Sequence, residues 1–120
     1  LIGHSGGGVI AALLAMRRDD VDSLVTVAAP LSLAGWIARH GLSPLEDALD
    51  PASMAASRAL PPAVHFAGAE DDVVPPSVMA EFTKHHGGRL ETVVGFDHDC
   101  CWARDWPALL LRARKQEGPP

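Results

Sequence analysis

The stretch LIGHSGGGVIAALLAM, residues 1–16, joins a short apolar segment to a long apolar one through a turn rich in glycine. Leu1 and Ile2 are typical of the last residues of a buried strand. Residues 7–18 are predicted to form a helix with apolar positions on nearly every side, so we expect it to be largely buried. Residues 3–6 form the turn between them. The stretch therefore predicts a strand that turns sharply into a buried helix.

Ser5 lies at the centre of this turn, in the pattern G-x-S-x-G over residues 3–7. Such a turn holds the serine in a strained backbone conformation, and small neighbours let strand and helix approach closely. Gly7 and Gly8 are expected to permit tight packing of the helix. The backbone N–H of Gly6 can donate to an oxyanion beside the serine. We predict a nucleophile; the alternative is a structural or phosphate-binding turn, although the P-loop pattern is absent.

Further apolar segments along the chain are predicted to be strands: residues 23–29, 63–68 and 90–95. Helices are predicted over residues 76–86, which begin with a proline, and over residues 106–115. This alternation predicts an α/β fold, with a parallel sheet and helices on both faces. Right-handed crossovers then bring the carboxyl ends of all strands to one edge of the sheet.

Residues 30–62 interrupt the alternation. Two short amphipathic pieces, residues 33–40 and 51–59, are separated by Gly41, Pro44 and Pro51. We expect an excursion from the sheet here rather than a strand.

Three acids follow the predicted strand 63–68: Glu70, Asp71 and Asp72. At the end of a parallel strand, a carboxylate can orient an imidazole and stabilise its charge. The alternative is a solvated acidic turn beside the next helix. Residue reasoning alone leaves the choice among the three acids open.

His98 directly follows the last predicted strand and is the candidate base. His4 is expected to line the site or to serve the turn, and His65 is predicted to pack inside the sheet. The two tryptophans that follow His98 are expected to anchor the last helix rather than bind a ligand: Trp102 and Trp106. The other histidines are assigned to exposed helix ends: His40, His85 and His86.

Possible metal ligands also surround His98, namely Asp97, Asp99 and Cys100. Their spacing resembles no structural zinc pattern, so we predict no metal. Cys100 and Cys101 are adjacent and cannot form a disulfide framework. We expect one of them to pack beside the histidine as a small apolar side chain.

The composition excludes some classes of partner. A net charge of −5 without a cluster of Lys and Arg argues against nucleic acid. The most apolar run, residues 9–16, is about two helical turns, whereas a membrane span needs about 20 residues, so no span is predicted. The chain opens without Met, and we expect it to begin in mid-fold with any targeting information upstream. Localisation and oligomeric state stay open.

The order of Ser5, Asp71 and His98 is the nucleophile–acid–base order of the α/β-hydrolase family. GHSGGG resembles the elbow of that family, GAEDDVVPP its acid loop and GFDHDCCW its histidine loop. This resemblance covers nearly all 120 residues. It implies that the acid is Asp71 and the base His98.

The resemblance further implies that residues 1–120 are the C-terminal portion of a single α/β-hydrolase domain, a partial fold. The strands before the elbow and the second oxyanion donor are absent, which exposes an apolar sheet edge. Residues 30–62 lie where the family inserts a lid or cap. Trp36 and Ile37 are expected to line an acyl pocket with His4, or alternatively only to cover the core.

The function that follows is a serine hydrolase that cleaves an ester-like bond of a small-molecule acyl substrate through an acyl-enzyme. No cofactor is implied. The isolated fragment lacks half of the expected oxyanion stabilisation, a loss of about 10²–10³ in rate. The alternative is a non-catalytic α/β-hydrolase-like domain that binds a ligand or a protein.

Overall fold

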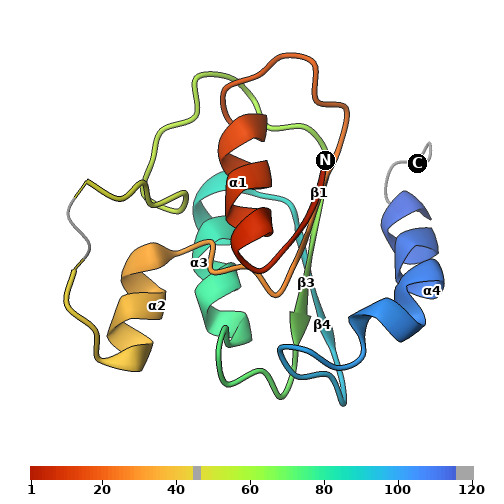
Figure 1. Ribbon diagram of the computed structural model, residues 1–120. Helices are drawn as coiled ribbons and strands as arrows, with labels where there is room; N and C mark the ends of the chain where they lie inside the picture. The colour runs from red at the N-terminus through yellow and green to blue at the C-terminus, as the bar shows by residue number, and fades with distance from the viewer. Residues whose placement is uncertain (45–46, 116–120) are drawn as a thin grey trace.

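The computed structural model describes residues 1–44 and 47–115 (Figure 1). Strands and helices alternate along the chain, as the sequence predicts. Their order is β1 (Ile2–His4), α1 (Gly6–Ala15), β2 (Leu24–Val27), α2 (Leu33–His40), β3 (Ala63–Gly68), α3 (Pro76–His86), β4 (Arg89–Val93) and α4 (Trp102–Lys115).

The four strands form one parallel sheet in the order β1-β2-β3-β4. Val25 of β2 pairs with Ile2 of β1 on one side and with Val64 of β3 on the other. Val64 in turn pairs with Arg89 of β4. Because every strand runs in the same direction, all four carboxyl ends meet at one edge, at the bottom of Figure 1. The predicted parallel sheet is confirmed.

Helices cover both faces of the sheet, which gives three layers (Figure 1). On one face, α1 and α3 bury an apolar cluster that includes Met16, Met79 and Phe82. On the other face, α4 packs Trp102 and Leu109 in a second cluster with strand residues. Burial on both faces accounts for the mostly apolar sequences of β2 and β3, whose polar members Thr26 and His65 are buried as well.

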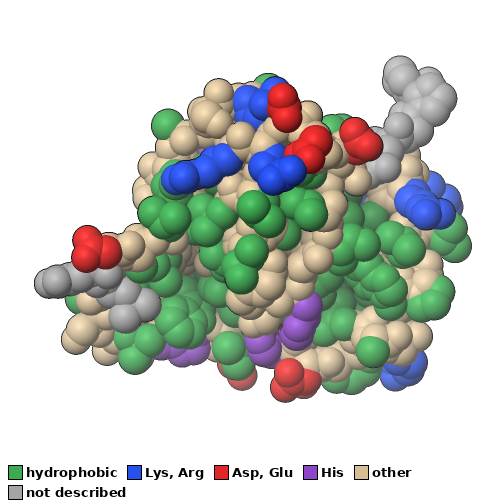
Figure 2. Space-filling view, turned by 45° about the horizontal axis from the view of Figure 1, so that its top comes forward, with side chains coloured by type: hydrophobic (Ala, Val, Ile, Leu, Met, Phe, Trp, Pro, Cys, Tyr) green, Lys and Arg blue, Asp and Glu red, His purple; other side chains and the backbone are tan. Residues whose placement is uncertain are grey.

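Helix α1 is shorter and less buried than predicted. It spans Gly6–Ala15 rather than residues 7–18, and its alanines carry the buried stripe. Ile10 and Leu14 are 61% and 41% exposed. A helix that packs on one side of a sheet buries only the stripe that faces it, even when the other positions are apolar. Apolar side chains accordingly cover much of the face seen in Figure 2.

Other predicted boundaries also differ from the structure, and β2 spans Leu24–Val27 rather than residues 23–29. Strand β4 ends at Val93 because Gly95 adopts a φ of 81° and the chain turns before it. Helix α4 begins at Trp102, about one turn earlier than predicted, because that side chain is buried and anchors the added turn. Of the two amphipathic pieces in the predicted excursion, residues 33–40 form α2, whereas residues 51–59 form turns and bends.

No helix among the described residues has the length and apolar character needed to cross a membrane.

His65 of β3 is packed inside the molecule, as predicted, and is fully buried. Its Nδ1 lies 2.7 Å from the Thr26 hydroxyl, and its ring meets Phe82 edge-on. Its buried Nε2 has no hydrogen-bond partner among the described residues. Burial disfavours the charged imidazolium and lowers the pKa of His65 from 6.5 to about 4.

We therefore expect acid to destabilise the protein through His65. The unfolded chain takes up a proton at a pKa near 6.5 and the folded chain only near 4, so stability is lost as pH falls through this window. The loss approaches about 3 kcal/mol in the free energy of unfolding below pH 4. Urea unfolding between pH 7 and pH 4 measures it, with His65→Gln as the non-titrating control. An equal decline in both proteins would contradict the assignment.

Candidate active site

The turn between β1 and α1 contains Ser5 alone, because β1 ends at His4 and α1 begins at Gly6. Ser5 has φ 53° and ψ −123°, a conformation that residues with a side chain rarely adopt. Its backbone N–H donates to the carbonyl oxygen of Val27 at 2.8 Å, which ties the turn to β2. Ser5 therefore has the strained backbone conformation that the glycine pattern predicts, while its part as a nucleophile stays a prediction.

Close backbone contact explains two of the glycines. A Cβ at Gly3 would lie 2.2 Å from the carbonyl oxygen of Gly7, and one at Gly8 would lie 2.5 Å from the Cβ of Ala29. A Cβ at Gly7 would meet nothing within 4 Å. The prediction of tight packing is therefore right for Gly8 and wrong for Gly7, whose contribution is its backbone.

These contacts predict opposite effects for two similar substitutions. Gly3→Ala forces the strand away from the helix and lowers the free energy of unfolding by about 3 kcal/mol. At Gly7 a Cβ meets open space, and alanine is a better helix former than glycine. Gly7→Ala therefore raises the free energy of unfolding by up to about 1 kcal/mol. Denaturant unfolding of the pair measures both. Similar changes in the free energy of unfolding at the two positions would show that the close contact at Gly3 does not restrict the side chain there.

The strain at Ser5 predicts that glycine is the more stable replacement there. With φ at 53°, Ser5→Gly is expected to exceed Ser5→Ala in free energy of unfolding by about 1 kcal/mol. Thermal unfolding of the two variants under identical conditions measures the difference. If Ser5→Ala were the more stable of the two variants, the backbone at this residue would not be strained.

Asp71 follows β3 and is the one buried acid of its loop; Glu70 and Asp72 are exposed. Its Oδ1 accepts hydrogen bonds from the backbone N–H groups of Val73 and Val74, at 2.8 and 2.7 Å. Its Oδ2 lies 3.0 Å from Nδ1 of His98. Asp71 is thus the acid of the three that contacts His98, and its part in catalysis stays a prediction.

His98 lies in the loop between β4 and α4 and links the acid to the serine. Its Nε2 is 3.1 Å from Oγ of Ser5, and its side chain is 16% exposed. A carboxylate only accepts hydrogen bonds, so the proton of the neutral ring belongs on Nδ1, facing Asp71. Nε2 is then free to accept the proton of the Ser5 hydroxyl. The three predicted residues form one continuous hydrogen-bonded line.

Backbone contacts join the loop of the acid to the loop of the base. A Cβ at Gly68 would lie 2.6 Å from the carbonyl oxygen of Phe96. The N–H of Ala69 donates to Val93, and that of Glu70 to the same Phe96 oxygen. Sequence reasoning missed this junction, for which Gly68 at the end of its strand was the available signal. The spacing between Asp71 and His98 thus depends on main chain as well as side chains.

Gly6, the predicted oxyanion donor, is the first residue of α1. Its N–H has no acceptor within the helix, because the first turn of a helix has none. It lies directly after Ser5 in the chain and at the positive end of the helix dipole. Its role remains a prediction.

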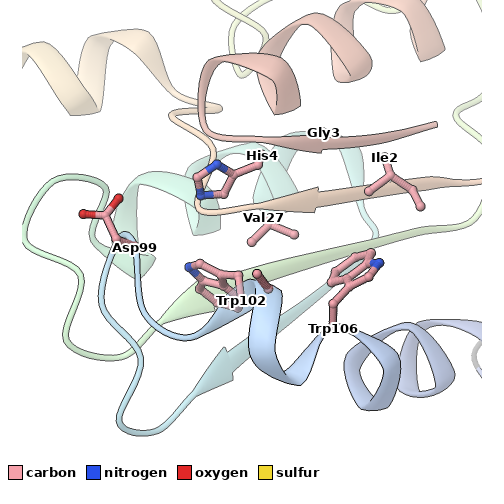
Figure 3. A pocket seen from close by; sticks show the side chains of 8 residues that line it. Ile2, Gly3, His4, Val27, Asp99, Trp102 and Trp106 are labelled. Atoms are coloured by element: carbon pink, nitrogen blue, oxygen red, sulfur yellow. The ribbon is translucent and has the colours of Figure 1, made fainter.

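A cavity of about 330 Å³ lies beside the elbow, between β1 and α4 (Figure 3). His4 and Asp99 lie at one end of it, and Ile2 and Trp106 at the other. His4, predicted to line the site, therefore borders an apolar space.

Trp36 and Ile37 do not line this cavity. Both belong to α2, where the indole N–H of Trp36 donates to the carbonyl oxygen of Val73, at 3.0 Å. Trp36 also packs against the core, which is the simpler role considered for it. Its part in binding an acyl group stays a prediction.

The residues around His98 have structural partners. Oδ1 of Asp97 accepts from the N–H groups of Cys100 and Asp99, at 2.6 and 2.9 Å, and these bonds lower its pKa. Cys100 and Cys101 are bonded to each other, and Cys101 packs against the apolar cluster that includes Phe96 and Trp102, as expected for one of the two. Across residues 1–44 and 47–115, no group of three His, Cys, Asp or Glu side chains is placed to hold a metal ion.

Several solved structures of other proteins are similar to this chain. Esterase 2 of Thermogutta terrifontis is 23% identical, with a TM-score of 0.67 over 98% of this chain. The esterase domain of a Rhodothermus marinus protein is 22% identical (TM-score 0.66, 98% of this chain), and a monoacylglycerol lipase of Paleococcus ferrophilus 15% (0.66, 97%). The chain has part of the α/β-hydrolase fold. It spans 54%, 59% and 68% of these three structures.

The α/β-hydrolase fold predicted from the three motifs is thus confirmed as a fold. No family model and no curated protein matches the chain.

Proposed function

We propose that this chain carries the catalytic residues of a serine hydrolase that cleaves ester-like bonds of small acyl substrates. The proposal rests on the line from Ser5 Oγ through both nitrogens of His98 to the buried carboxylate of Asp71, at 3.1 and 3.0 Å. Several solved structures of the same fold are esterases or lipases, which supports the reaction class.

In the first half-reaction, Ser5 Oγ attacks the carbonyl carbon of the substrate while His98 Nε2 takes the hydroxyl proton. The carbonyl oxygen becomes an oxyanion, to which the N–H of Gly6 donates. The tetrahedral intermediate collapses, the bond to the leaving oxygen breaks, and His98 returns its proton to that oxygen. An alcohol leaves and the acyl group stays on Ser5.

In the second half-reaction, water replaces the alcohol. His98 Nε2 takes a proton from the water as its oxygen attacks the acyl carbon. When this intermediate collapses, Ser5 Oγ leaves and takes the proton from His98. A carboxylic acid is released and the serine is regenerated, so no cofactor is consumed.

The surroundings of Asp71 suit it to this cycle. His98 becomes positively charged twice in each turnover, and a fixed anion beside Nδ1 stabilises that charge. Two backbone N–H groups hold the other carboxylate oxygen, so the side chain cannot rotate away. Because the carboxylate is buried, little water screens the attraction.

Residues 30–62 form the proposed lid. Helix α2 within it contacts the acid loop through Val73, whose carbonyl oxygen accepts from Trp36 and lies 2.6 Å from Nε2 of His40. We propose that this segment borders the acyl group on the acid side, with Trp36 and Ile37 facing it. His4 would border the opposite side.

Labelling with a fluorophosphonate, which reacts with activated serines, tests the proposal. Esterase 2 of Thermogutta terrifontis is phosphoramylated by tabun, a related reagent. In the protein at its native length we expect labelling that Ser5→Ala and His98→Ala abolish. Asp71→Asn should slow it by up to about 10⁴-fold, because the imidazole loses its charge partner and correct tautomer. The rate is read by intact-protein mass spectrometry over time.

Asp72→Asn is the matched control, since Asp72 is the exposed neighbour of Asp71, and it should label at the parent rate. A folded protein that does not label would remove the hydrolase mechanism and favour the non-catalytic binding domain.

A further inference from the structure

Trp102, the first residue of α4, contacts the backbone of the base. Its indole Nε1–H lies 3.1 Å from the carbonyl oxygen of His98 and 3.1 Å from that of Asp97. One donor thus bridges two successive peptide groups of the loop. Figure 3 shows Trp102 on the side of the cavity nearest His4 and Asp99.

The indole of Trp102 is itself immobile. The residue is 6% exposed and packs in the apolar cluster under the sheet. Phe96 meets it edge-on, with ring centroids 4.8 Å apart. A donor held this rigidly fixes the position of its acceptors, because moving them would leave a buried N–H unpaired.

The other backbone restraints on the His98 loop act on its flanks: Phe96 is bonded to the acid loop, and the N–H of Asp97 donates to the carbonyl oxygen of Cys100. No strand ladder includes it, since β4 ends at Val93 and α4 begins at Trp102. The Asp97 carboxylate closes a tight turn on the residues after His98 but does not bond to His98 itself. Within the described residues, the carbonyl oxygen of His98 is contacted by two side chains, Trp102 and His4, whose Nε2 is 3.4 Å away.

These two contacts reach different parts of the site. His4 precedes Ser5 in the elbow, whereas Trp102 belongs to the helix on the far side of the base. The peptide of His98 is therefore held between the strand of the nucleophile and α4. Rotation of this peptide would swing the imidazole, whose two nitrogens must stay near 3 Å from both of their partners.

We propose that Trp102 is a positioning residue for the base: its indole N–H holds the main chain of His98 so that the imidazole reaches Ser5 and Asp71 together. The inference rests on the proposed function for its catalytic meaning. That the Trp102 N–H sets the orientation of the His98 ring is independent of the proposed function.

The test removes the donor and keeps the aromatic packing. Trp102→Phe lacks the N–H, and Trp106→Phe is the matched control because no hydrogen bond from its indole occurs among the described residues. The first readout does not depend on catalytic activity. It is the downfield proton NMR resonance of the His98 Nδ1–H, which is hydrogen-bonded to Asp71. We expect it in the parent and in Trp106→Phe, and expect it lost or broadened in Trp102→Phe.

The second readout is the fluorophosphonate labelling rate as a function of pH. Trp102→Phe should lower the rate about 10- to 100-fold and shift the pH at which it is half-maximal, whereas the exposed control Asp72→Asn should leave the rate unchanged. If Trp102→Phe fails to fold, benzothienylalanine at position 102 replaces the N–H by sulfur with the ring shape kept.

An unchanged His98 resonance and labelling rate in a folded donor-less variant would overturn the proposal. A parent protein that never labels, yet loses the His98 resonance on removal of the donor, would overturn the hydrolase function and leave the positioning role standing.

Discussion

The contact between the backbones of Gly3 and Gly7 is the constraint on which the candidate site depends. A side chain at Gly3 has no space against the Gly7 carbonyl, so β1 and α1 meet without an intervening loop. The chain can make this turn only by placing Ser5 at a positive φ. That conformation is unfavourable for a serine, and it persists because the sheet and the helix hold both sides of it.

The parallel sheet brings two further residues, Asp71 and His98, next to Ser5 at this turn. The acid and the base each follow a different strand, and parallel order brings both ends to the edge where Ser5 lies. Burial then gives the array its electrostatic character. The Asp71 carboxylate has lost its water and receives two backbone N–H groups and the imidazole in exchange, so its orientation is determined by the fold.

The parts of the site that the sequence predicted are those with short local signals. Ser5 stood out because glycines flank it between a strand and a helix, and His98 because it follows a strand directly. The assignment of Asp71 needed the resemblance. Burial and the hydrogen bond to His98 separate it from Glu70 and Asp72, and both depend on contacts distant in the chain. The role of Trp102 was inaccessible for the same reason: an indole N–H aimed at a carbonyl has no signature in residue spacing.

The junction at Gly68 and Phe96 has an evolutionary consequence. Because the acid loop and the base loop share backbone hydrogen bonds, an insertion in either would displace both reactive groups, and natural variation should be excluded there. Residues 41–62, by contrast, lie outside the sheet and contain no strand or helix in the parts described. Apart from the side chains that are buried or pack on the core, such as Pro51 and Ala52, that segment can therefore change in length without moving the strand ends that hold Ser5, Asp71 and His98.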